Sequence, residues 1–184
     1  MKIRLPHAPY IANKIAIDLL NSGFVTLQSG LEPVVKVSQE LIEEDIHKEM
    51  ALEERVEELL DDNEDDMEFM QVDRRNMFWL IKKKLAKEYK VVLSYEDRYS
   101  DLAHRVMEKI WKDDLVEYTV AENRIKNIIY TAMESYIESF EDVEEIVAEK
   151  ITHYKRKLIP GSPEYDLVFE RLYEEELRKK GLLL

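Results

Sequence analysis

The chain of 184 residues contains no cysteine, and it has few glycines and no long apolar run. Without cysteine there is no disulfide framework, thiolate metal site or cysteine nucleophile, so we expect a protein of the cytoplasm. The longest apolar run, Met77 to Ile81, is far shorter than the roughly 20 residues that cross a bilayer. The first residues lack the apolar block and cleavage site of a signal peptide. We therefore expect neither secretion nor a membrane span.

Motifs that carry enzyme chemistry are also missing. We find no glycine-rich phosphate loop, no Gly-x-Ser-x-Gly turn and no paired-carboxylate pattern. Glu44 and His47 have the spacing found in di-iron bundles, but the second such motif and the two further glutamates are lacking. The run 61–66 begins like a calcium-binding loop, yet Asp66 stands where that loop needs glycine. We predict no catalytic residue, no metal site, no cofactor and no small-molecule substrate, and a protein that is not an enzyme.

What the sequence has in abundance is charge, and its distribution is uneven. Charged residues make up 36% of the chain, and the net charge is −13. Residues 40–68 hold fifteen acidic side chains against Lys48 and Arg55, so this segment carries the whole of that net charge. High charge with little glycine, glutamine or asparagine is typical of a thermostable protein.

An acidic surface repels a phosphate backbone and attracts a basic partner. The candidate acidic partner face consists of Glu54, Glu58, Asp61, Asp62 and Asp65.

The apolar spacing predicts helices through the first half of the chain. A short amphipathic helix over 9–21 ends before Gly23, which suits the left-handed turn after a helix. A brief extended link precedes a long helix that opens with a capping box at Ser29 to Glu32 and ends near Leu60. The acidic run then breaks this helix by like-charge repulsion.

A third helix is predicted from Met67 or Val72 to Tyr89, with Lys82 to Lys84 facing outward.

The second half repeats this order. Ser94 is the predicted cap of a short helix, Leu115-Val116 is the link, and Thr119 to Glu122 is a capping box before another long helix. Shifting the chain by 91 residues aligns the apolar positions of the two halves. We predict an elongated all-α protein of two similar three-helix repeats, 1–93 and 94–184, each with a short, a long and a medium helix.

A small basic cluster precedes the last predicted helix. Ser162 is its expected N-cap and Pro163 its first residue. Because cations beside a helix N-terminus bind anions, this cluster is a candidate anion or partner contact, formed by Lys155, Arg156, Lys157 and Ser162. The alternative is that the cluster pairs with acidic neighbours such as Glu174 and Glu175.

Both ends of the chain resemble a known family. The segment Ile159-Pro-Gly-Ser-Pro-Glu-Tyr165, an aromatic helix and the close at 174–181 resemble the end of the bacterial proteins grouped as domain of unknown function 507. The start, Tyr10-Ile-Ala-Asn-Lys-Ile15 through Gly23-Phe-Val25, is similar to the start of that family. The resemblance implies an all-helical protein without an established activity or cofactor, and short members of the family would correspond to one half of this chain.

These observations favour a cytoplasmic, non-enzymatic interaction or scaffold protein with an acidic face. Long helices that outreach their neighbours leave apolar surface for a protein partner or for self-association. The alternative is a nucleic-acid- or ribosome-associated factor that uses the basic residues 82–84 and 155–157.

Overall fold

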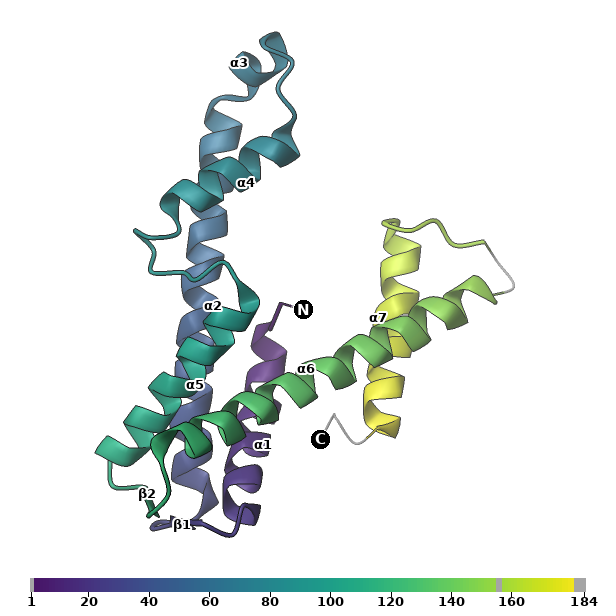
Figure 1. Cartoon of the computed structure of the whole chain (residues 1–184). Coiled ribbons are helices and arrows are strands. Elements are labelled where there is room, and N and C mark those ends of the chain that lie inside the picture. The colour runs from purple at the N-terminus through teal and green to yellow at the C-terminus, as the bar shows by residue number, and fades with distance from the viewer. Residues whose placement is uncertain (1, 155–156, 181–184) are drawn as a thin grey trace.

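The computed structural model describes residues 2–154 and 157–180, which are mostly helical (Figure 1). The elements in chain order are η1 (Leu5–His7), α1 (Ala8–Asn21), β1 (Val25–Leu27), α2 (Leu31–Asp62), α3 (Glu64–Phe69), α4 (Arg74–Leu85), α5 (Tyr95–Lys112), β2 (Val116–Tyr118), α6 (Glu122–Thr152) and α7 (Pro163–Lys179). The predicted all-α class is confirmed, and the two expected links form a two-stranded sheet. Within the described ranges, no helix combines the length and apolar character that crossing a membrane requires.

Four helices form the base of the molecule. α1 packs against both α2 and α6, and α5 also packs against both long helices. Beyond this base α2 and α6 diverge, with α4 lying along the outer part of α2 and α7 along the outer part of α6 (Figure 1). We call α2 with α3 and α4 the α2 arm, and α6 with α7 the α6 arm.

Apolar residues at helical spacing explain why the base forms. Ile15 and Leu19 of α1, Ile42 of α2, Ile110 of α5 and Ile129 of α6 are completely buried in one shared core. A smaller core in the α2 arm joins the outer part of α2 to α3, α4 and the loop after α4, through Leu52, Val56, Leu60, Met67, Ala86 and Val91. The main core therefore draws on both halves of the chain, as the apolar periodicity requires for helices that each bury one face.

The strands close the base at one end. β1 and β2 pair antiparallel, with Thr26 opposite Glu117 at the centre of the register. The pairing continues past β1, because the Gln28 N–H donates to the Leu115 carbonyl at 2.9 Å. The chain then turns at Gly30, whose φ of 81° lies in the left-handed region that glycine adopts readily.

The helix caps divide into correct and incorrect predictions. The hydroxyl of Ser94 accepts from the Asp97 N–H at 3.4 Å, and Ser94 is the N-cap of α5 as predicted. The predicted capping boxes at Ser29 and Thr119 are wrong. The N-caps of α2 and α6 are Gly30 and Ala121, and neither helix has a side-chain hydrogen bond at its N-cap. At Ser29 the physical reason is the extended pairing through Gln28, which delays the helix start to Leu31.

The acidic run ends the long helix as predicted, but the short helix that follows was not predicted. α2 ends at Asp62 with Asn63 as its C-cap, and the next residues form α3 with three carboxylates in its first turn, where the helix dipole favours negative charge. Of the two predicted starts of the third helix, Val72 lies close to the start of α4, whereas Met67 falls within α3. A turn in which Gln71 has a φ of 54° separates these two helices. Asp73 caps the second of them by accepting from the Arg75 N–H at 3.1 Å.

Candidate functional site

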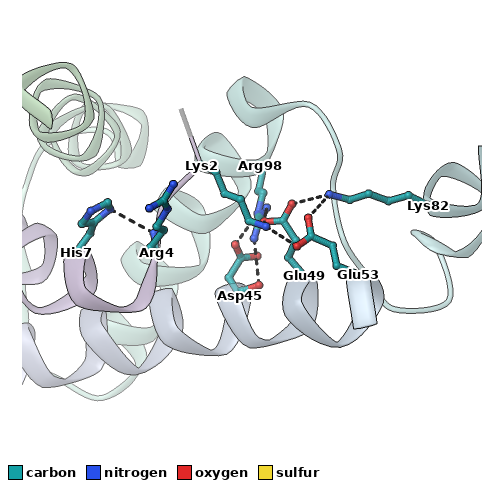
Figure 2. Close-up of polar contacts among 8 residues, drawn as sticks. All are labelled: Lys2, Arg4, His7, Asp45, Glu49, Glu53, Lys82 and Arg98. Atoms are coloured by element: carbon teal, nitrogen blue, oxygen red, sulfur yellow. Dashed lines mark hydrogen bonds and ion pairs between the residues drawn. The ribbon is translucent and has the colours of Figure 1, made fainter. Parts of the chain in front are cut away.

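A cluster of charged side chains, most of them buried, lies where α2 meets α4 and α5 (Figure 2). Arg98 of α5 donates to Asp45 and to Glu49 of α2, each at 2.6 Å. Lys82 of α4 donates to Glu49 at 2.9 Å and to Glu53 at 2.7 Å. We call these five residues the ion cluster. The prediction that Lys82 faces outward with its neighbours is wrong, since only 3% of Lys82 is exposed.

The spacing on α2 explains how the cluster assembles. Asp45, Glu49 and Glu53 are four residues apart, so their carboxylates lie along one face of the helix. Alone they would repel one another, and the cations that neutralise them come from three other parts of the chain: Arg98, Lys82 and Lys2. Three carboxylates at this spacing, beside buried apolar residues, were the only sequence signal for the cluster.

Electrostatics favours the charged forms of Glu49 and Lys82. Burial alone would raise the pKa of Glu49, but hydrogen bonds from Arg98 and Lys82 outweigh it and hold that pKa below its ordinary value. Burial would likewise lower the pKa of Lys82, and bonds to Glu53 and Glu49 raise it instead. Since these buried charges pair with one another, the cluster locks α4 and α5 onto α2 rather than presenting a reactive group.

The candidate acidic face lies at the end of the α2 arm. Its members Glu54, Glu58, Asp61, Asp62 and Asp65 are all exposed. Asp61 pairs with Arg74 at 2.6 Å and Glu58 with Arg55 at 2.8 Å, whereas the other three carboxylates make no ion pair with any described residue.

Two apolar side chains follow these carboxylates in the chain, and Phe69 lies one helical turn after Asp65 on α3. Phe69 is 90% exposed and Met70 is 64% exposed. We call residues 54–70 the acidic tip.

The candidate basic contact is only partly covered by the structure. Lys155 and Arg156 lie outside the described residues, and Lys157 is exposed. The Ser162 hydroxyl accepts from the Tyr165 N–H at 3.2 Å, so it serves as the predicted N-cap of α7. Of the acidic neighbours, Glu175 pairs with Lys179 at 2.9 Å and Glu174 lines the cleft described next.

A cleft of about 740 Å³ lies where η1 and the start of α1 meet α6 and α7. Its aromatic lining consists of His7, Tyr10, Phe140, Phe169 and Tyr173, and its charged lining of Arg4, Glu144, Asp166, Glu170 and Glu174. We call it the aromatic cleft. Sequence reasoning did not find it, because its residues come from opposite ends of the chain.

His7 and Phe140 form one wall of the aromatic cleft. Their ring centroids are 4.2 Å apart, and both residues are buried. Burial and the neighbouring Arg4 lower the pKa of His7 to about 4, so the imidazole is neutral near pH 7. The Nδ1 atom of this neutral ring accepts from the backbone N–H of Arg4 at 3.3 Å (Figure 2).

No arrangement for metal binding accompanies these features. Among the described residues, no three His, Asp or Glu side chains are grouped so that they could hold a metal ion. Glu44, proposed above only for its spacing to His47, instead pairs with Lys48 and with Arg105.

Fold and surfaces together define an all-helical protein with two divergent arms, one ending in the acidic tip and the other carrying the aromatic cleft. The chain belongs to the family described as protein of unknown function (DUF507), whose family model matches residues 1–182. The resemblance inferred from the two ends is thereby confirmed, and the match extends over both halves of the chain. No match is found among curated proteins. The family description assigns no activity.

Proposed function

We propose that this protein is a cytoplasmic, non-enzymatic interaction or scaffold protein whose acidic tip binds a basic segment of a protein partner. The observation that carries the proposal is Phe69, which is 90% exposed beside carboxylates that lack described ion-pair partners. An apolar ring among acidic side chains matches a partner surface that is both basic and apolar.

The energetics support the same conclusion. Covering Phe69 with a partner removes its apolar surface from water, which contributes about 2 kcal/mol. The carboxylates of the acidic tip speed the approach of a basic partner and repel a nucleic acid.

The nucleic-acid alternative draws less support from the structure. Lys82, one of the basic residues it requires, is engaged by Glu49 and Glu53 and is buried. Lys83 and Lys84 remain exposed, which leaves only two cations at that position.

Capture of partners from the native host tests the acidic tip. We expect the triple variant Asp62→Lys, Asp65→Lys and Phe69→Ser to retain at most about a tenth of the partner bound by wild type, because it removes both charge and apolar contact. Partners are identified and quantified by mass spectrometry.

A matched control for this experiment lies on the α6 arm. The variant Glu138→Lys, Glu145→Lys and Leu167→Ser makes the same kinds of change at exposed positions and should bind as wild type does. Equal capture by wild type and both variants would show that the acidic tip is not the binding surface.

We also propose that residues 1–93 and 94–184 are two similar repeats that interlock. The strands and long helices support this, because β1 and β2 start 91 residues apart and so do α2 and α6. At that offset Thr26 corresponds to Glu117, and these two residues face each other in the sheet. A residue opposite its own equivalent is what a two-fold relation between repeats produces.

An experimentally determined structure tests the repeat. Superposing the Cα atoms of residues 8–62 on the second half should give the lowest deviation when they are matched to 99–153. A lower deviation at another offset would contradict the repeat, because a duplicated unit has one register.

A further inference from the structure

We propose that the aromatic cleft binds a lysine or arginine side chain from a peptide segment of a partner protein. This site is separate from the acidic tip, since it lies on the α6 arm and is built from η1, α1, α6 and α7.

Aromatic faces form the walls of the cleft. Phe169 and Tyr173 stack along α7 with centroids 5.8 Å apart, and Tyr173 lies 6.3 Å from Phe140 across to α6. The His7 ring also packs against Phe140, with centroids 4.2 Å apart. An ammonium or guanidinium group within about 6 Å of such a ring is attracted to its face. The methylene stem of a lysine or arginine packs against the same apolar walls.

The charges of the cleft select a cation over an anion. Four carboxylates line it, from Glu144, Asp166, Glu170 and Glu174, against the single guanidinium of Arg4. None of the four forms a hydrogen bond or ion pair with another described residue through its side chain. Nearby acidic groups on α7 are satisfied differently, since Glu176 pairs with Lys150 and Lys179. The cleft therefore carries four carboxylates that form no ion pair with any described residue, although Arg4 also lines it.

At the position of the α2 arm that corresponds to the aromatic cleft, the chain itself supplies the cations. Glu49 and Phe140 lie equally far along α2 and α6, whose first residues are 91 apart. Around Glu49 the neighbouring elements supply Lys82 and Arg98.

The corresponding contacts around Phe140 carry no cation. The medium helix supplies Tyr173, and the segment before α1 supplies His7. Glu144 remains at the position that matches Glu53, which holds Lys82 in the other arm. A cation from another chain that entered the cleft would take the place that Lys82 occupies in the ion cluster.

His7 indicates that the cation arrives on a peptide. Its Nδ1 accepts from the Arg4 N–H, so the proton of the neutral ring is on Nε2. No described residue accepts that proton, although only 8% of His7 is exposed and it lines the cleft. The Nε2–H is thus available to a carbonyl oxygen, which a peptide has and a simple amine lacks. The low pKa of His7 keeps this ring neutral, so it does not repel the cation.

A peptide titration of the full chain tests the site. The probes are acetylated and amidated pentapeptides with a central arginine, lysine, citrulline or norleucine flanked by glycines, and the readout is the NMR signals of the His7 and Tyr173 rings. We expect saturable shifts with arginine and lysine, and at least about fivefold weaker binding with citrulline and norleucine. Equal affinity for citrulline or norleucine, or no saturable shift with any probe, would overturn the proposal.

Matched variants separate this site from the acidic tip. Neutralising two cleft carboxylates with Glu144→Gln and Glu170→Gln should weaken the arginine peptide roughly three- to tenfold, and Phe169→Ala should weaken it about two- to fivefold. The pair Asp62→Asn and Asp65→Asn removes the same charge at the acidic tip and should leave the affinity unchanged. If the tip pair weakens binding as much as the cleft pair, the effect is one of net charge and the cleft is not the site.

Discussion

Replacing Arg98 by methionine is expected to lower the free energy of unfolding by about 3–5 kcal/mol. Arg98 is 4% exposed and is the shared partner of Asp45 and Glu49, both on α2. Methionine fills much of the arginine volume but leaves Asp45 with only the partly exposed Arg105, at 3.9 Å, and Glu49 with Lys82 and the more distant Lys2, also at 3.9 Å. The cost arises from those stranded charges, because the desolvation of a buried carboxylate is offset only while its partner is present.

Urea unfolding at pH 7 measures this change, and Arg55→Met is its control. Arg55 forms an exposed pair with Glu58 on the same helix, and losing such a solvent-screened pair should change the free energy of unfolding little. A second variant that adds Glu49→Gln to Arg98→Met should recover part of the loss, because it removes one uncompensated charge. Equal losses for Arg98→Met and Arg55→Met would show that the ion cluster does not stabilise the fold.

Acidification is expected to destabilise the protein through His7 by about 2 kcal/mol between pH 7 and pH 5. The pKa of His7 is lowered to about 4 in the folded chain, whereas its ordinary value is 6.5. Below pH 6.5 the unfolded chain therefore binds a proton that the folded chain does not. Stability is complete above pH 6.5 and falls as the pH drops toward 4, because protonation favours the unfolded state.

The measurement is the free energy of unfolding as a function of pH for wild type, His7→Gln and His47→Gln. His7→Gln should flatten the slope between pH 7 and pH 5, and the same replacement at the exposed His47 is the matched control. Below about pH 4.5 we expect a further loss of stability from Glu49. Its pKa is held low only in the folded state, so the unfolded chain binds a proton there that the folded chain does not. A flat wild-type profile from pH 7 to pH 5 would contradict the buried, neutral His7.

Local features of the fold could be predicted from the sequence because they depend on neighbouring residues. Apolar spacing predicted the helices of the base, and the hydroxyls of Ser94 and Ser162 identified two helix starts. Gly23 has the predicted left-handed conformation, with a φ of 81°. The wrong capping boxes at Ser29 and Thr119 show the limit of this reasoning, since strand pairing with a distant segment moved the start of α2.

The candidate sites depended on contacts between distant parts of the chain. In the sequence, Asp45 and Glu49 belong to an acidic run that is expected to be solvated. No neighbouring residue indicated that Arg98 and Lys82 would pair with them in a buried cluster. The aromatic cleft joins His7 to residues of α6 and α7. By contrast, the acidic tip was identifiable from composition, because a dense run of like charge stays in water wherever the chain places it.

The sequence by itself determined the all-α class, the family and the acidic character of residues 40–68. Only the tertiary structure decided which charges are buried and which cavity is left open. The physical reason is that periodicity specifies which face of a helix is apolar, whereas partners are specified by packing among helices far apart in the chain. In the α2 arm that packing places cations next to the carboxylate of Glu49. In the α6 arm it places aromatic rings around Phe140 and leaves a cleft open beside them.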